Sequence, residues 1–186
     1  MSLHTTEHDL HHGHLAAYIA GQPSAGGLGW QVGSASQVDT QTLLIREDLM
    51  AFLAQGNASN ESSWKSLVND CGRDEAALWE DVRSGAMAAM KQAPTHVQLL
   101  REGMKIRGHH FSLWNPAVGR NTQQSQLRDF SRNCLRMTNE VVLHAGFKKV
   151  RPVSRRPDQA YHINGIYYAM AEIKARQTGQ AAALHG

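Results

Sequence analysis

The dipeptide Asn164-Gly165 is the feature that most constrains how this chain can fold. Both residues tolerate positive φ, so the pair favours the two-residue type I′ turn that joins neighbouring antiparallel strands. Strand-like runs flank it on both sides, at 159–163 and 166–173. The sequence therefore predicts a β-hairpin centred on this dipeptide.

Two acidic residues lie near the open end of this predicted hairpin. Asp158 stands six residues before Asn164, and Glu172 stands seven residues after Gly165, so the hairpin returns both to the same end of the ribbon. Lys174 follows on the same strand face as Glu172, because side chains alternate with a period of two. Carboxylate oxygens suit Mg²⁺, and a bound Mg²⁺ sharpens a water nucleophile and stabilises a pentavalent phosphate. The grouping predicts metal-dependent phosphodiester hydrolysis.

An ideal hairpin does not bring these two carboxylates together. Regular pairing from a two-residue turn places Asp158 opposite Ala171 and directs Glu172 to the other face of the sheet. A single extra residue in one strand corrects this, and such bulges are common beside active sites. We therefore predict a β-bulge or bend within 158–161 or within 169–172. The first interval is favoured, because the preceding proline cannot donate a ladder hydrogen bond.

Basic residues concentrate around these carboxylates. The whole chain carries 19 Lys and Arg against 16 Asp and Glu, but residues 144–176 hold seven basic residues and only two acidic ones. A local cationic surface of this kind is expected of a site that holds a polyanion such as DNA. The candidate phosphate contacts are Lys148, Lys149, Arg151, Arg155 and Arg156. A solvated basic loop is the alternative that charge alone leaves open.

The remaining patterns predict a single α/β domain over residues 1–186. Residues 1–95 are mainly helical, with predicted helices at 6–20, 47–55, 63–69 and 74–91. Residues 96–186 carry a sheet, with further strands predicted at 97–100, 111–114 and 140–144 and one helix at 124–137.

Several classes of protein are excluded by what the chain lacks. Its longest apolar stretches are too short to cross a bilayer, and its N-terminus has no signal-peptide core, so no membrane partner is expected. Cys71 and Cys134 alone build neither a disulfide framework nor a four-ligand zinc module, which favours a reducing cytoplasm. The five histidines between residues 4 and 14 are interpreted as surface or tag-like residues.

One family accounts for the hairpin and its carboxylates together. Pro157-Asp158, followed after thirteen residues by Glu172-Ile173-Lys174, resembles the PD-(D/E)xK nuclease motif. The wider pattern is similar to the N-terminal endonuclease domain of the restriction (motor) subunit of type I restriction enzymes. In that family the Asp opens a strand ending in Asn-Gly, and the Glu-x-Lys is followed by Thr-Gly-Gln, here residues 178–180.

The resemblance implies a fold and an activity. The fold is a restriction-endonuclease-like core, a small mixed sheet flanked by helices, with a helical N-terminal part. The activity is that of the endonuclease domain of a type I site-specific deoxyribonuclease, whose cleavage is not itself tied to a sequence. Asp158 and Glu172 would bind Mg²⁺ or a substituting Mn²⁺, with the Ile173 carbonyl as a third ligand, and Lys174 would assist the attacking water. The further candidate site residues are Glu7, Gln177 and Gln180.

The resemblance also implies partners. These are double-stranded DNA and the methylation and specificity subunits of a restriction complex. ATP belongs to the helicase lobes of a full-length motor subunit, and this chain has no Gly-Lys phosphate loop with which to bind it. We therefore expect a fragment of a larger chain. Two alternatives stay open: a stand-alone small nuclease of the same superfamily, and a catalytically silent DNA-binding or subunit-docking module.

Overall fold

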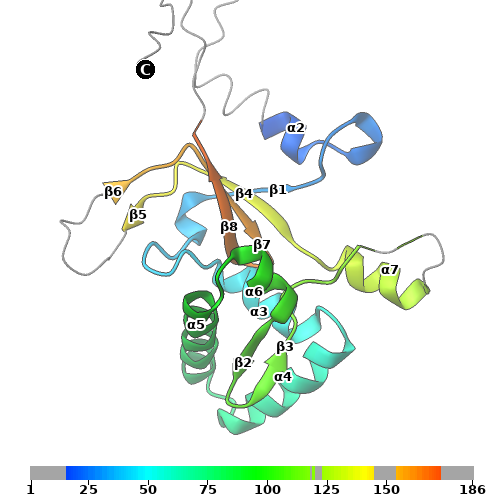
Figure 1. Cartoon of the computed structure of the whole chain (residues 1–186), viewed down its shortest axis with the longest axis vertical. Helices are drawn as coiled ribbons and strands as arrows, with labels where there is room; N and C mark the ends of the chain where they lie inside the picture. Colours follow the sequence, from blue (N-terminus) through cyan, green and yellow to red (C-terminus); the bar gives the residue numbers. More distant parts are fainter. Residues whose placement is uncertain (1–15, 118, 120–122, 145–153, 173–186) are drawn as a thin grey trace, which may run out of the picture.

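The structure, a computed structural model, describes residues 16–117, 119, 123–144 and 154–172. Within these ranges the chain forms six α-helices and a small mixed sheet, which confirms the α/β class (Figure 1). None of the described helices is long and apolar enough to cross a bilayer.

The elements follow one another along the chain with short connections. The helices are α2 (Ala16–Ala20), α3 (Arg46–Gln55), α4 (Ala58–Asp70), α5 (Glu75–Gln92), α6 (His96–Glu102) and α7 (Gln124–Ser131), with 3-10 turns η2 (Pro23–Ala25) and η3 (Ala35–Gln37). The strands are β1 (Gln31–Gly33), β2 (Met104–Ile106), β3 (His109–Phe111), β4 (Leu135–Asn139), β5 (Leu143–His144), β6 (Ser154–Arg155), β7 (Gln159–Ile163) and β8 (Ile166–Ala171).

The main sheet has four strands in the order β1-β4-β7-β8. Strand β1 runs parallel to β4, whereas β4 with β7 and β7 with β8 are antiparallel. Two further pairs, β2 with β3 and β5 with β6, form separate two-stranded sheets. Figure 1 shows the main sheet above the helical body of α3 to α6, with α7 and the β5–β6 pair projecting at opposite sides.

Several predicted elements are wrong. Residues 97–100 belong to α6 rather than to a strand, because the Thr95 hydroxyl accepts a hydrogen bond from the Gln98 amide (3.1 Å) and so caps a helix. The predicted helix 124–137 ends at Ser131, and residues 135–137 instead join β4. Pairing with strands on both sides outweighs their helical spacing.

Two predicted strands also have different bounds. The strand predicted at 111–114 ends at Phe111, where its pairing with β2 stops. The strand predicted at 140–144 is divided, because β4 ends at Asn139 and Glu140 adopts a positive φ of 55°, which breaks the extended backbone before β5.

The main core joins the helical body to the sheet. Apolar side chains from α3 to α6 pack with the β2–β3 pair, and Leu49, Leu53, Val82 and Phe111 are among those almost fully buried. Ile166, the first residue of β8, belongs to the same cluster. The hairpin is therefore anchored in the core at its closed end.

The Asn164-Gly165 turn has the predicted conformation and is buried. The φ values of 51° and 79° place both residues in the left-handed region. The Gly165 carbonyl accepts a hydrogen bond from the Ile45 amide (2.9 Å), just before α3. A Cβ atom on Gly165 would lie 2.5 Å from the backbone nitrogen of Leu49, so only glycine fits beneath this helix.

The Asn164 side chain connects the turn to two other segments. Its Nδ2 donates to the Leu113 carbonyl (2.9 Å) and to Asn133 Oδ1 (3.1 Å), while its Oδ1 accepts from the Cys134 amide (2.6 Å). The turn thereby fixes the chain that follows β3 and the chain that enters β4.

A buried ion pair holds α3 against the sheet. Arg136 on β4 donates two hydrogen bonds to the Asp48 carboxylate, at 2.6 and 2.8 Å. Their side chains are only 14% and 9% exposed. The hydrogen bonds to Asp48 raise the pKa of Arg136. Loss of either partner would leave a buried charge unpaired.

His162 gives the fold a dependence on pH. Its ring is fully buried on β7, with Nε2 donating to the Leu43 carbonyl (3.2 Å) and Nδ1 without a hydrogen-bond partner. Burial lowers the pKa of His162 to about 4, an effect that the Leu43 carbonyl only partly offsets. The folded protein therefore keeps this ring neutral where an unfolded histidine is protonated.

We predict that the free energy of unfolding falls as the pH is lowered from about 6.5 to 4. In this interval the unfolded chain binds a proton on His162 that the folded chain does not bind. The free energy of unfolding therefore falls by about 1.4 kcal/mol per pH unit and by about 3 kcal/mol in all. Urea unfolding at several pH values measures the slope. His162→Gln should be less stable at pH 7 but lose less stability on acidification, and identical pH slopes would contradict this account.

Candidate active site

The β7–β8 hairpin contains the predicted register shift. Pairing is regular from Ile163 with Ile166 to His162 with Tyr167, and then continues from Tyr161 with Ala169, so Tyr168 is the extra residue. The predicted location is wrong, because the shift lies nearer the turn than either predicted interval.

Aromatic packing explains the position of the bulge. The Tyr167 ring packs edge-on against His162, with centroids 5.9 Å apart, and is half-buried. On the other face Tyr161 packs edge-on against Trp30, with centroids 5.5 Å apart. Tyr168 is left between these two contacts and is exposed. The proline before Asp158 lies outside β7, so it does not need to donate a ladder hydrogen bond and does not cause a bulge in that strand.

The shift changes which residues meet at the open end of the hairpin. The last paired residues are Gln159 and Ala171, which Asp158 directly precedes and Glu172 directly follows in the sequence. If the same register continued by one residue, Asp158 would lie opposite Glu172. Directly opposed residues of an antiparallel pair lie on the same face, with Cβ atoms about 4.5–5.5 Å apart. Asp158 is half-buried and Glu172 is exposed. Both predicted ligands therefore lie next to the last residue pair at the open end of the hairpin, and neither is fully buried.

Glu140 is an acidic neighbour that sequence reasoning missed. It directly follows β4, and its amide donates to the Asp158 carbonyl (3.0 Å), so it adjoins Asp158 on the side away from β8. Sequence reasoning assigned Glu140 to a strand at 140–144 and therefore did not consider it as a site residue. Knowledge that β4 ends at Asn139 and pairs with β7 would have placed Glu140 beside Asp158.

Arg156 lies against this acidic row. Its guanidinium forms an ion pair with the Glu140 carboxylate, and both side chains are about half exposed. The hydrogen bond to Glu140, and more weakly the charge of Asp158, raise the pKa of Arg156. A residue predicted to contact phosphate is thus engaged with a carboxylate beside Asp158.

The other predicted site residues are placed only in part. Arg155 lies in β6, where it pairs with Leu143 of β5. The candidates outside the described residues are Lys148, Lys149, Arg151, Ile173, Lys174, Glu7, Gln177 and Gln180. The N-terminal histidines also lie outside them.

Both cysteines have thiols whose pKa is raised by burial. Cys71 is buried and donates to the Asp81 carboxylate (3.2 Å), and burial raises the pKa of its thiol. Burial likewise raises the pKa of Cys134 to about 11. Neither environment favours the reactive thiolate.

The described residues contain no group of three or more His, Cys, Asp or Glu side chains arranged to hold a metal ion. The candidate site offers the two carboxylates of Asp158 and Glu172, which flank the last residue pair of the hairpin. Mg²⁺ commonly binds through one or two carboxylates and keeps several waters. The chemistry of this pair therefore fits Mg²⁺ better than a metal that needs an all-protein cage.

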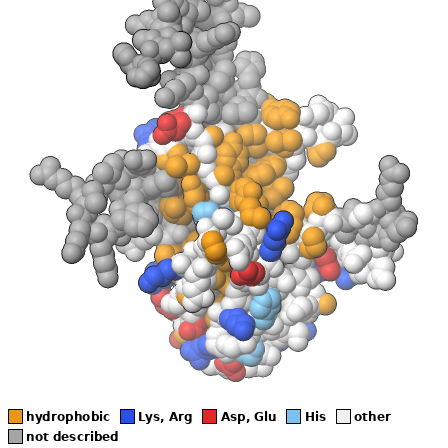
Figure 2. All heavy atoms as spheres, viewed as in Figure 1, with side chains coloured by type: hydrophobic (Ala, Val, Ile, Leu, Met, Phe, Trp, Pro, Cys, Tyr) orange, Lys and Arg blue, Asp and Glu red, His pale blue; other side chains and the backbone are white. Residues whose placement is uncertain are grey.

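The surface around the hairpin is divided by chemical type. Figure 2 shows apolar side chains gathered over the sheet, while charged side chains lie mainly over the helical body. On β8, Tyr168 and Met170 are 37% and 50% exposed. The apolar surface thus extends along β8 toward the open end of the hairpin.

Comparison of the chain with protein families, with curated proteins and with solved structures finds no match. The nuclease resemblance therefore depends on the residues of the hairpin and on the geometry described above.

Proposed function

We propose that the protein is a Mg²⁺-dependent endonuclease module that cleaves DNA without sequence specificity, as the nuclease part of a type I restriction subunit. The observation that carries this proposal is the register shift at Tyr168, because the shifted register, continued by one residue, would oppose Asp158 and Glu172. A regular hairpin would separate these carboxylates onto two faces. A bulge that re-aims one side chain is a common device beside active sites.

Each residue at the open end of the hairpin has a role in this proposal. Asp158 and Glu172 bind the ion, and the Ile173 carbonyl supplies a third oxygen. When bound, Mg²⁺ supplies Lewis acidity toward the attacking water and the phosphate oxygens. Lys174 orients the water and offsets the negative charge that develops on the phosphate. Mn²⁺, which also accepts carboxylate and water ligands, is expected to substitute.

The β5–β6 hairpin supplies the phosphate contacts in this proposal. Lys148, Lys149 and Arg151 belong to the connection between the paired strands, and Arg155 lies in β6 itself. Asp158 follows β6 after two residues, so Arg155 is close along the chain to a proposed metal ligand. Such contacts hold the DNA backbone without reading its bases.

Arg156 limits electrostatic repulsion at the site. Three acidic residues, Glu140, Asp158 and Glu172, lie at the ends of three neighbouring strands. Their combined charge would oppose an approaching phosphate. The ion pair of Arg156 with Glu140 offsets one of these charges. We infer that Glu140 holds Arg156 in place beside Asp158.

The proposed partners follow from the proposed role. Double-stranded DNA is the substrate, and the methylation and specificity subunits of a cytoplasmic restriction complex are the expected protein partners. Sequence recognition then belongs to those subunits.

Substitution of a proposed metal ligand should abolish cleavage. We predict that Asp158→Asn, Glu172→Gln and Lys174→Gln each reduce the rate of plasmid nicking in Mg²⁺ by at least about 100-fold, because each removes a group needed for the hydrolytic step. DNA binding should persist, because the basic contacts are unchanged. The assay follows conversion of supercoiled to nicked circles.

The matched control for the carboxylates is Glu47→Gln, an exposed residue in the first turn of α3. It should nick at the parental rate. Parental nicking by all three site variants would show that Asp158, Glu172 and Lys174 do not form the active site.

The basic connection should dominate the salt dependence of DNA binding. We predict that the triple variant Lys148→Gln, Lys149→Gln, Arg151→Gln flattens the slope of log Kd against log salt by about 2 to 3, because each lost phosphate contact removes about 0.9 from the slope. Fluorescence anisotropy across a salt series measures it. A control triple variant with the same change of charge uses the exposed residues Lys65, Lys91 and Arg101 and should keep the parental slope. Equal slopes in the two triples would place the DNA elsewhere.

A further inference from the structure

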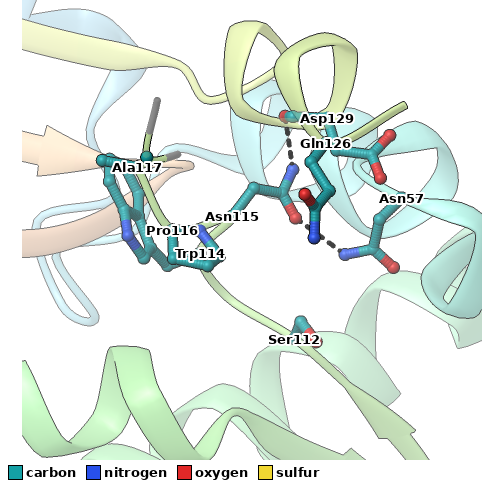
Figure 3. Close-up of a pocket in the computed structure, with 9 residues that line it drawn as sticks. Asn57, Ser112, Trp114, Asn115, Pro116, Ala117, Gln126 and Asp129 are labelled. Atoms are coloured by element: carbon teal, nitrogen blue, oxygen red, sulfur yellow. Dashed lines mark hydrogen bonds between the residues drawn. The ribbon is translucent and has the colours of Figure 1, made fainter. Parts of the chain in front are cut away.

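A pocket of about 400 Å³ lies between α7, the start of α4 and the chain that follows β3 (Figure 3). Its residue Asn115 receives a hydrogen bond from Asn133, just before β4 begins, whereas Asp158 adjoins Glu140, just after β4 ends. The pocket thus lies at the opposite end of β4 from the proposed cleavage site and shares no residue with it. Its volume is within the range of roughly 300–1,000 Å³ that is usual for small-molecule sites.

One wall of this pocket is fixed by the buried side chain of Asn115. Its Nδ2 donates to the carbonyls of Gly56 (2.8 Å) and Asp129 (2.6 Å), and its Oδ1 accepts from Asn57 Nδ2 (2.9 Å). The backbone amide of Asn115 also donates to Asn133 Oδ1 (3.0 Å). These bonds tie α3, α4 and α7 together. The wall is therefore preorganised rather than assembled by a ligand.

Two polar groups of the lining remain unused. Asp129 Oδ1 is buried and has no hydrogen-bond partner among the described residues, and Arg132 Nη1 is 3.8 Å away, beyond hydrogen-bond distance. The Gln126 side chain also makes no hydrogen bond within the described part of the chain, and Figure 3 shows its amide beside those of Asn57 and Asn115. A buried acceptor without a donor is costly, so a ligand N–H that reached Asp129 would be favoured.

The opposite wall is flat and largely apolar. Figure 3 shows Trp114 and Pro116 on the other side of Asn115 from Gln126 and Asp129. The Trp114 ring is half-buried and is held edge-on by Phe130, with centroids 6.0 Å apart and planes at 86°. The lining thus combines an aromatic ring with amide and carboxylate groups, which suits a planar ligand with a polar edge.

We propose that this pocket binds a single unpaired nucleobase with an exocyclic amino group, adenine or cytosine. Nucleobases stack on aromatic side chains irrespective of sequence. Their edges pair with particular groups: a glutamine amide with adenine, and a carboxylate with the cytosine amino group. Thymine has no amino group, and its one N–H donor lies between two carbonyl oxygens, so a thymine that donated to Asp129 would bring a carbonyl oxygen close to the carboxylate. The base belongs either to a DNA strand or to a free nucleoside, and the two share this chemistry.

The test uses short oligonucleotides of abasic sites that carry one central base or none. Anisotropy in EDTA should show that cytosine or adenine binds about tenfold more tightly than thymine or no base. Gln126→Ala should lose most of this advantage. Its matched control is Gln124→Ala, the same residue type, equally exposed on α7 but outside the pocket, and it should keep the advantage. Asp129→Asn should reduce the preference over thymine.

Competition with free deoxycytidine and deoxyadenosine separates the two sources. Displacement of the oligonucleotide at nucleoside concentrations similar to the Kd of the oligonucleotide supports a nucleoside site. Displacement only at nucleoside concentrations far above that Kd supports a base presented by DNA. Equal affinity for all the oligonucleotides, or equal losses in Gln126→Ala and Gln124→Ala, would overturn the proposal. Because the assay contains no metal, its result is independent of cleavage.

Discussion

The buried Asn164-Gly165 turn is the constraint on which the other features depend. Its backbone accepts the Ile45 amide at the start of α3, and its asparagine side chain binds the chain after β3 and the chain before β4. Because Gly165 lies directly beneath Leu49, the closed end of the hairpin cannot shift relative to the helical body. The Asp48–Arg136 ion pair then fixes the neighbouring strand against the same helix. The hairpin is thus held rigidly at its closed end, while Asp158 and Glu172 at its open end remain accessible to solvent.

That support explains why a single extra residue decides the chemistry. With the turn fixed, the position of Glu172 depends only on the number of residues between Gly165 and the open end. Tyr168 is accommodated as a bulge because Tyr167 packs against His162 while Ala169 resumes pairing with Tyr161. Continued by one residue, this register would place Asp158 and Glu172 on one face. The same hairpin buries His162 in neutral form, so the element that positions the carboxylates also makes the fold sensitive to acid.

Features determined by local chemistry could be predicted from the sequence. The turn required only Asn and Gly, the bounds of β7 followed from its strand-like composition, and the need for a register shift followed from alternation. The location of the shift could not be predicted, because it depends on Trp30 and His162, which meet the hairpin only in the folded chain. Glu140 was missed for a similar reason: its place beside Asp158 depends on where β4 ends. The pocket beside Asn115 depends on partners of that residue at the end of α3, at the start of α4 and on α7, which meet only in the folded chain.

The pairing of Asp158 with Glu172 is the central claim, and a cross-strand disulfide tests it most directly. In a background with Cys71 and Cys134 replaced by alanine, Asp158→Cys with Glu172→Cys should oxidise to an intramolecular disulfide, because opposed Cβ atoms lie about 4.5–5.5 Å apart. Asp158→Cys with Ala171→Cys, the pair that a regular hairpin would oppose, should keep its thiols free. Thiol titration and mass spectrometry report the outcome. A disulfide in the second pair but not in the first would contradict the register on which the proposed active site depends.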